Sequence, residues 1–248
     1  MIRNPGEARY PDPFSQAGPA QADVAKAAMP AVDPGSPLFF LSYAHSQVST
    51  RNMGEARERN WRFTQFFRDL SENLAELVSR PTGSDPGYMD LGYMDQSISD
   101  GERWSPELQK AIGTCQVFVA LLSPVYFGRP FCGLEWHAFS QRRVLSYTPA
   151  ETITQTAILP VIWAPVRDQD VPAVVRAVQW FYPRDMPTGT LRYESDGVVG
   201  LLQLDDVGYK SVVWRLAQRI AEIHYSHRVE PSSFQFGELR NIFEEPTA

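Results

Sequence analysis

The feature that most constrains the fold is an alternation of apolar runs and amphipathic segments. Apolar runs fill residues 38–41, 115–123 and 156–166, and each is short enough to form a buried strand. A final strand is expected after a short helix or turn at 174–183. Strands without a polar face belong in a parallel sheet that helices cover on both sides. The pattern therefore predicts a doubly wound α/β fold with about five parallel strands.

The segments between these runs have the spacing of helices. Apolar residues recur every three or four positions in 60–80 and again in 209–227, which we expect to be the closing helix. Residues 87–95 predict a second strand that leads into a long polar loop. Ser105 and Pro106 are typical of a helix start at the end of that loop.

Composition and charge are those of an ordinary globular protein. The chain has 248 residues, of which 43% are hydrophobic and 21% charged, and its net charge is −6. These values indicate no basic surface for nucleic acid, and no apolar run is long enough for a membrane span or a signal peptide. We therefore expect a cytoplasmic protein that binds neither nucleic acid nor membranes. Cys115 and Cys132 lack metal-ligand spacing, so we expect buried thiols and no metal site.

Three parts are expected along the chain. Residues 1–36 are rich in Pro, Ala, Gly and Gln without a sustained apolar period, which predicts a disordered leader. Residues 37–227 hold the predicted strands and helices and form the domain. Residues 228–248 are expected to be a C-terminal tail or linker.

Polar residues that follow the strands mark the expected ligand edge. In open α/β sheets, ligands bind beyond the carboxyl ends of the strands. Ser42, Tyr43 and His45 follow the first strand in this way. Asp95 and Asp100 flank the loop after the second strand, and we expect them to cap turns.

Glu135 is unusual because helical spacing places it on an apolar face with Phe131 and Phe139. Carboxylates are rarely buried without a partner. One explanation is structural: an ion pair with Arg142 or Arg143, or the favourable field of the nearby helix N-terminus. The other explanation is that the protein keeps a carboxyl group there for chemistry.

Four motifs occur in the order found in TIR domains. They are FFLSYAHS at 39–46, YMDQSISDGERW at 93–104, AIGTCQVFVALLSPVYF at 111–127 and CGLEW at 132–136. The resemblance covers roughly residues 37–227, and it is closest to an actinobacterial TIR-like group. It implies the TIR fold, a flavodoxin-like parallel sheet with helices on both faces.

The resemblance also implies an activity. Enzymatic TIR domains cleave the nicotinamide–ribose bond of NAD⁺, sometimes with cyclisation of the ADP-ribose, and their catalytic glutamate matches Glu135. NAD⁺ is then the substrate, and no separate cofactor is expected. A fixed carboxylate would stabilise the oxocarbenium-like sugar as nicotinamide leaves. The residues expected to bind the substrate are Ser42, Tyr43, His45, Ser99, Gly101, Trp104 and Phe131.

Several of these residues also have a simpler explanation. Trp104 could pack in the core instead of stacking on a base, and His45 could be a surface residue. Phe131 stands where many enzymatic TIR domains have Trp, and Ala44 and His45 follow the first strand where the family often has basic residues. These departures favour an alternative function, a non-catalytic TIR module that binds other TIR domains.

Control by assembly is a further expectation. The 91–104 loop contains glycines and short polar residues, so we expect it to be mobile in an isolated subunit. TIR domains commonly contact each other through this loop, which implies that the active state is a homo-oligomer. The resemblance also implies a role as an effector of bacterial defence or stress responses.

Overall fold

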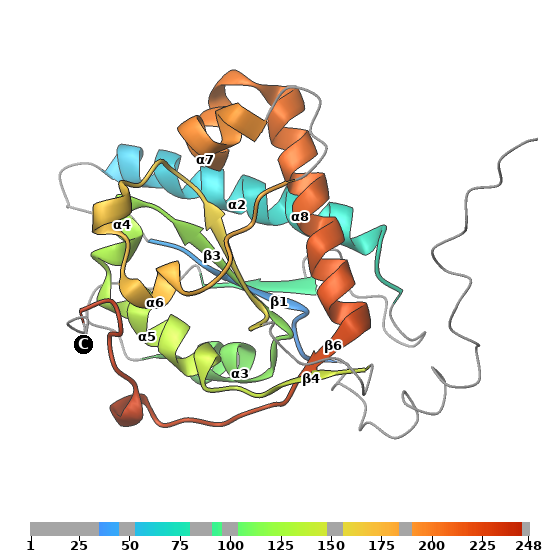
Figure 1. The fold of residues 1–248 in the computed structure, drawn as a ribbon, viewed down its shortest axis with the longest axis vertical. Coiled ribbons are helices and arrows are strands. Elements are labelled where there is room, and N and C mark those ends of the chain that lie inside the picture. The colour runs from blue at the N-terminus through green and yellow to red at the C-terminus, as the bar shows by residue number, and fades with distance from the viewer. Residues whose placement is uncertain are drawn as a thin grey trace, which may run out of the picture.

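A parallel four-stranded sheet forms the centre of the molecule (Figure 1). The computed structural model describes residues 35–44, 53–79, 91–95, 104–147, 156–183 and 190–244. The strands, in their order across the sheet, are β2 (Gly92–Met94), β1 (Phe39–Ser42), β3 (Val117–Leu122) and β5 (Ile158–Ile162). This arrangement confirms the predicted doubly wound α/β class.

The parallel pairing explains both the apolar sequence of the strands and the position of the polar residues that follow them. Ser42 at the end of β1 pairs with Ala120 of β3, and Leu122 at the end of β3 pairs with Ile162 of β5. Every residue of β1, β3 and β5 is buried, so these strands have no polar face. Because the strands are parallel, their carboxyl ends meet at one edge of the sheet.

Helices cover both faces of this sheet. Two helices pack together on one face, α2 (Met53–Ala75) and α8 (Asp206–Ser226), while two others pack together on the opposite face, α3 (Pro106–Thr114) and α5 (Pro130–Ser140) (Figure 1). The remaining helices are α4 (Pro124–Phe127), α6 (Ala173–Arg176) and α7 (Thr190–Leu204). The sequence pattern predicted this three-layer arrangement.

Local signals for helices are confirmed in detail. The hydroxyl oxygen of Ser105 accepts a hydrogen bond from the Leu108 N–H at 3.1 Å, and Pro106 occupies the first helical position of α3. The core face of α2 and the turn after it is also the predicted one. Its buried side chains are Phe63, Phe66, Phe67, Leu70, Leu74 and Val78.

The described residues form one parallel strand fewer than expected. After α6 the chain passes the outer edge of β5 without forming a strand, although the Phe181 N–H donates to the Pro160 carbonyl at 2.9 Å. Pro160 has no N–H to donate in return. The N–H of Ile162 donates instead to the hydroxyl of Tyr193 at 2.9 Å. These contacts give hydrogen-bond partners to the Pro160 carbonyl and the Ile162 N–H of β5, as a fifth strand would have done.

A two-stranded antiparallel sheet was not expected. It pairs β4 (Val144–Ser146) with β6 (His227–Val229). The buried guanidinium group of Arg142, just before β4, donates to the carbonyls of Ile112 and Cys115 at 2.9 and 2.7 Å. It also donates to the Glu230 carbonyl at 3.1 Å, so Arg142 ties the C-terminal part of the chain to the end of α3.

The segment that follows β6 lies against the domain. Residues 230–244, here called the C-terminal strap, run across α3 and α5 (Figure 1). The Ser232 N–H donates to the Gly113 carbonyl of α3 at 3.0 Å. This segment belongs to the expected tail or linker, and its described part packs on the helices. Residues 1–34 of the expected leader lie outside the described residues.

Candidate functional site

The carboxyl edge of the sheet brings Glu135 next to the end of β1. Glu135 lies on α5 and is 5% exposed, and its Oε2 accepts a hydrogen bond from Ser42 Oγ at 2.5 Å. Ser42 Oγ also lies 2.9 Å from the hydroxyl of Tyr126 on α4. Either hydroxyl group can donate in this second bond. Three side chains from three elements therefore form a row of hydrogen bonds that ends on a carboxyl group.

This carboxyl group has no ionic partner among the described residues. Arg142, one of the expected structural partners, binds backbone carbonyls at the end of α3 instead. Arg143, the other candidate, also makes no ion pair with Glu135 within the described residues. Glu135 is thus a buried acid held by a neutral hydroxyl group, which is an expensive arrangement for a charged carboxylate.

Burial raises the pKa of Glu135 to about 8. The hydrogen bond from Ser42 opposes this rise, and the negative charge of Asp95 adds to it. Burial also raises the pKa of Tyr126 and of the Cys132 thiol, and both groups are protonated at neutral pH. Glu135 is therefore the group of these three whose charge changes near neutral pH.

Tyr43 connects β1 to the end of β2 and to α5. Its hydroxyl donates to the backbone carbonyl of Asp95 at 2.6 Å, and its own carbonyl accepts a hydrogen bond from the Cys132 thiol at 3.6 Å. Its ring packs against Phe63 of α2 with 4.5 Å between centroids. These contacts fix the position of α5, and hence of Glu135, relative to the strand ends.

Asp95, which we expected to cap a turn, directly follows β2 and is buried. Asp95 is 6% exposed. Its negative charge contributes to the raised pKa of Glu135, of Tyr43 and of Tyr93. The negative charge of Asp95 disfavours the charged form of Glu135. Asp95 therefore helps to set the proton affinity of the site.

Trp104 packs against the C-terminal strap. Its side chain is 5% exposed, and its ring makes edge contacts with Phe234 and Phe236, at centroid distances of 6.0 and 5.6 Å. Its buried indole N–H has no hydrogen-bond partner among the described residues. Trp104 therefore packs in the core of the described structure, which was the simpler of its two expected roles. Phe131 is half-buried on α5, one turn before Glu135.

The structure brings together Ser42, Tyr43 and Glu135 from the set of expected site residues. Three others, His45, Ser99 and Gly101, lie outside the described residues. The assignment of substrate-binding roles to these residues stays a prediction.

Sequence reasoning did not single out Tyr126 or Cys132 as members of the site. A signal existed for each residue. Tyr126 lies in the stretch that follows β3, where polar groups at the carboxyl edge are expected. Cys132 precedes Glu135 by three positions and therefore shares its side of α5.

The C-terminal strap covers the outer side of α5. The ring of Phe243 packs against Tyr126 and Trp136, with centroid distances of 5.6 and 6.0 Å. The side chain of Asn241 lies so close to Gly133 that any Cβ at this position would collide with it. Tyr126 is therefore held between the strap and the hydrogen-bonded row that ends at Glu135.

These features define a doubly wound α/β domain with a buried acid at the carboxyl edge of its sheet. The TIR domain family model matches residues 86–193, a range that includes β2, β3, β5 and the helix that carries Glu135. The chain therefore contains a TIR domain, as the four motifs predicted. A search of curated proteins and of solved structures found no match. Membership of the actinobacterial group stays a prediction.

Two other kinds of feature are not found in the described part of the chain. None of its helices combines the length and the apolar character needed to cross a membrane. None of its clusters of His, Cys, Asp and Glu has the three members that could hold a metal ion.

Proposed function

We propose that this TIR domain cleaves the nicotinamide–ribose bond of NAD⁺ and that Glu135 is its catalytic residue. The observation that supports the proposal most is the buried Glu135 carboxyl group at the carboxyl edge of the sheet, bound by Ser42. TIR domains include NAD⁺-cleaving enzymes as well as adaptors. The proposed biological role is that of a cytoplasmic effector in bacterial defence or stress responses.

The reaction requires few groups from the protein. Nicotinamide is positively charged in NAD⁺, so it leaves as a neutral base without a general acid. The bond between nicotinamide nitrogen and the anomeric carbon breaks, its electron pair stays on nitrogen, and the sugar becomes oxocarbenium-like. The Glu135 carboxylate stabilises this cation in a site with little water. Water then adds to the anomeric carbon and loses a proton, which gives ADP-ribose.

The raised pKa of Glu135 is compatible with this role. With a pKa of about 8, Glu135 is mostly protonated at neutral pH in the free protein. The nicotinamide ring of bound NAD⁺ carries a positive charge, which lowers the pKa of a neighbouring carboxyl group. Substrate binding therefore favours the carboxylate form that stabilises the transition state. Ser42, Tyr43, Trp104 and Phe131 are proposed to contact the substrate, together with His45, Ser99 and Gly101.

Release of nicotinamide from NAD⁺ by the purified full chain tests the proposal. Glu135→Gln keeps the size of the side chain and a hydrogen-bond acceptor for Ser42, but removes the charge. We expect this variant to lose about 10²-fold or more in kcat. Glu107→Gln, at an exposed position of α3, is the matched control and should retain the rate. Cleavage that persists in Glu135→Gln would contradict the assignment of Glu135.

The second candidate is a non-catalytic module that binds other TIR domains. The observation that favours it is the position of Trp104, whose ring packs against Phe234 and Phe236. In that position the ring makes edge contacts with protein side chains and is buried among them. Absence of NAD⁺ cleavage in protein that has demonstrably assembled would favour this second function.

A further inference from the structure

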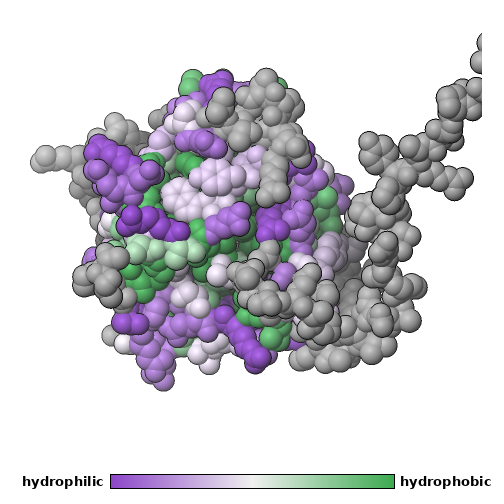
Figure 2. All heavy atoms as spheres, in the orientation of Figure 1, coloured by the Kyte–Doolittle hydropathy of each residue, from purple (hydrophilic) through white to green (hydrophobic). Residues whose placement is uncertain are grey.

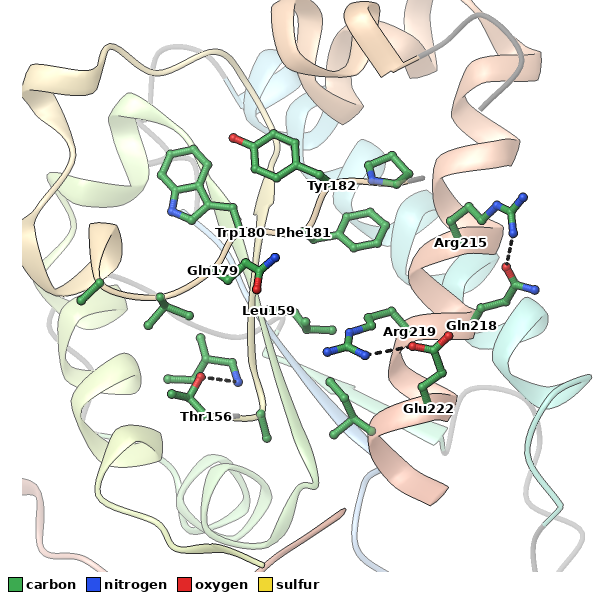
Figure 3. Close-up of a pocket in the computed structure, with 16 residues that line it drawn as sticks. Thr156, Leu159, Gln179, Trp180, Phe181, Tyr182, Arg215, Gln218, Arg219 and Glu222 are labelled. Carbon is green, nitrogen blue, oxygen red and sulfur yellow. Dashed lines mark hydrogen bonds and ion pairs between the residues drawn. The ribbon is translucent and has the colours of Figure 1, made fainter. Parts of the chain in front are cut away.

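A cavity of about 1050 Å³ lies at the outer edge of β5, and its lining contains none of the residues of the Glu135 site. It opens between residues 177–183 and α8, where the sequence had suggested a fifth strand (Figure 3). On this face of the molecule, hydrophobic residues are visible between strongly hydrophilic ones (Figure 2). A volume of this size matches the clefts that hold small-molecule ligands.

One side of the cavity is aromatic and fixed by hydrogen bonds. It is formed by Trp180, Phe181 and Tyr182 (Figure 3). The Trp180 Nε1–H donates to the Val175 carbonyl at 3.1 Å, and the backbone N–H of Phe181 donates to the Pro160 carbonyl of β5. The side chain of Tyr182 remains 47% exposed, so an aromatic face is open to a ligand.

The opposite side is polar and carries excess positive charge. Arg215 and Arg219 lie one turn apart on α8, and therefore on the same face of the helix. Arg219 forms an ion pair with Glu222 at 2.9 Å, and Arg215 donates to Gln218 at 3.1 Å (Figure 3). Two guanidinium groups and one carboxylate leave a net positive charge on this side.

We propose that this cavity is a second ligand site, for a small molecule of the nucleotide class. A planar base would stack on Tyr182 and Trp180, because aromatic rings bind bases through their faces. Its phosphate groups would bind Arg219, whose guanidinium group extends towards the aromatic side (Figure 3), because guanidinium groups form paired, charge-assisted hydrogen bonds with phosphate oxygens. Arg215, one turn away and directed towards Gln218, adds positive charge to this side. This site goes beyond the proposed cleavage of NAD⁺ and does not depend on it.

The edge of β5 is poorly suited to the other plausible occupant, a strand from a protein partner. Strand addition requires free backbone N–H and carbonyl groups along the edge. Pro160 supplies no N–H, and the N–H of Ile158 already donates to Thr156 Oγ1 at 3.3 Å. A small ligand that uses the side chains of the two walls fits the cavity better.

Titration of the full chain with ADP by isothermal calorimetry tests the proposal. We expect saturable binding that weakens with added salt, with adenosine and inorganic phosphate each binding more weakly than ADP. Arg219→Ala should raise the Kd by about tenfold or more, and Tyr182→Ala by several-fold. Arg68→Ala changes an exposed arginine on α2 and is the matched control, with an unchanged Kd. Circular dichroism establishes that each variant is folded.

Three outcomes would overturn the proposal. The first is a folded protein that shows no saturable binding of ADP at millimolar concentration. The second is ADP binding that neither Arg219→Ala nor Tyr182→Ala weakens. If the protein does not bind ADP but self-associates, and Tyr182→Ala abolishes this self-association, the first outcome applies and the cavity instead binds a protein partner. The third is ADP binding that disappears in Glu135→Gln, because the ligand would then occupy the other site.

Discussion

At the scale of single residues, Glu135 is held by hydrogen bonds that do not neutralise its charge. Ser42 donates to its carboxyl oxygen and Tyr126 supports Ser42, but both groups are neutral. A buried carboxyl group in such surroundings prefers to keep its proton. The charged form that catalysis would use is therefore the form that the folded protein tolerates less well.

The first prediction concerns the pH dependence of stability. In the folded protein burial raises the pKa of Glu135 from 4.5 to about 8, so between these values the folded state keeps a proton that the unfolded chain releases. The contribution of Glu135 to the free energy of unfolding is thus fully present below pH 4.5. It is lost as pH rises towards 8, by up to about 1.4 kcal/mol per pH unit. Glu135→Gln should remove this decline. The free energy of unfolding of the variant, relative to that of the unmodified protein, should therefore increase with pH. Urea unfolding across this pH range measures it, and parallel pH profiles for the two proteins would contradict it.

The second prediction concerns Ser42 and rests on the proposed NAD⁺ cleavage. Its hydrogen bond lowers the pKa of Glu135, so Ser42→Ala should raise that pKa further. If the carboxylate is the active form, kcat/KM of the unmodified protein rises with pH through about 8, and the variant's profile moves to higher pH. Tyr126→Phe removes only the second bond of the row and should shift the profile less. An unchanged profile in Ser42→Ala would argue against this coupling.

At the scale of elements, the C-terminal strap completes the surface of α3 and α5. It is anchored by backbone hydrogen bonds, by ring contacts and by the packing of Asn241 on Gly133. Most strap residues are exposed, so a few anchor points hold the whole segment. Phe243 is the anchor closest to the site, because its ring contacts Tyr126 directly.

The third prediction is that Phe243→Ala loosens the strap. The substitution removes ring contacts with Tyr126, Phe127 and Trp136 from a half-buried position. We expect the free energy of unfolding to fall by about 1–2 kcal/mol. Hydrogen exchange should also become faster in residues 230–244.

Glu244→Ala, at the exposed neighbouring position, is the control for Phe243→Ala and should leave both measurements unchanged. Exchange in the strap that stays slow in Phe243→Ala would show that other anchors hold it alone. In that case the next anchor to examine is the hydrogen bond that the backbone N–H of Arg240 donates to the side-chain Nδ1 of His137 at 3.1 Å.

At the scale of the whole molecule, TIR domains generally interact with other TIR domains. We propose that this chain does so through the 91–104 loop, whose first part forms β2 and whose last residue is Trp104. Trp104 packs on the strap in the single chain, so contact of the loop with a second subunit would change the position of this ring. Assembly would then complete the site around Glu135.

The fourth prediction follows from this coupling. The rate of NAD⁺ cleavage should rise faster than linearly with protein concentration, because mass action populates the assembled form. Initial rates over a wide concentration range, with light scattering on the same samples, measure both quantities. Glu135→Ala should abolish the activity and leave the assembly intact. A specific activity that is independent of concentration would refute control by assembly.

Local sequence patterns were enough to predict the fold class and most of the central elements. Apolar runs and helical periodicity are local, so they predicted β1, β3, β5 and the core face of α2 correctly. The cap at Ser105 depends on neighbouring residues and was equally predictable. The position of Glu135 on the helix after β3 also followed from local spacing and from the TIR motifs.

The tertiary structure decided what surrounds Glu135, which residue binds it and where the chain after β6 goes. Ser42 is 93 positions from Glu135 and 84 from Tyr126, and no local pattern encodes contacts over such separations. The described residues form no fifth strand beside β5 because Phe181 and Tyr193 contact its edge, and these contacts again join distant segments. The pKa of Glu135 is likewise a property of its burial, since the same side chain in water would have an ordinary value. Periodicity fixes which residues face the core, whereas packing between distant segments fixes which of them meet.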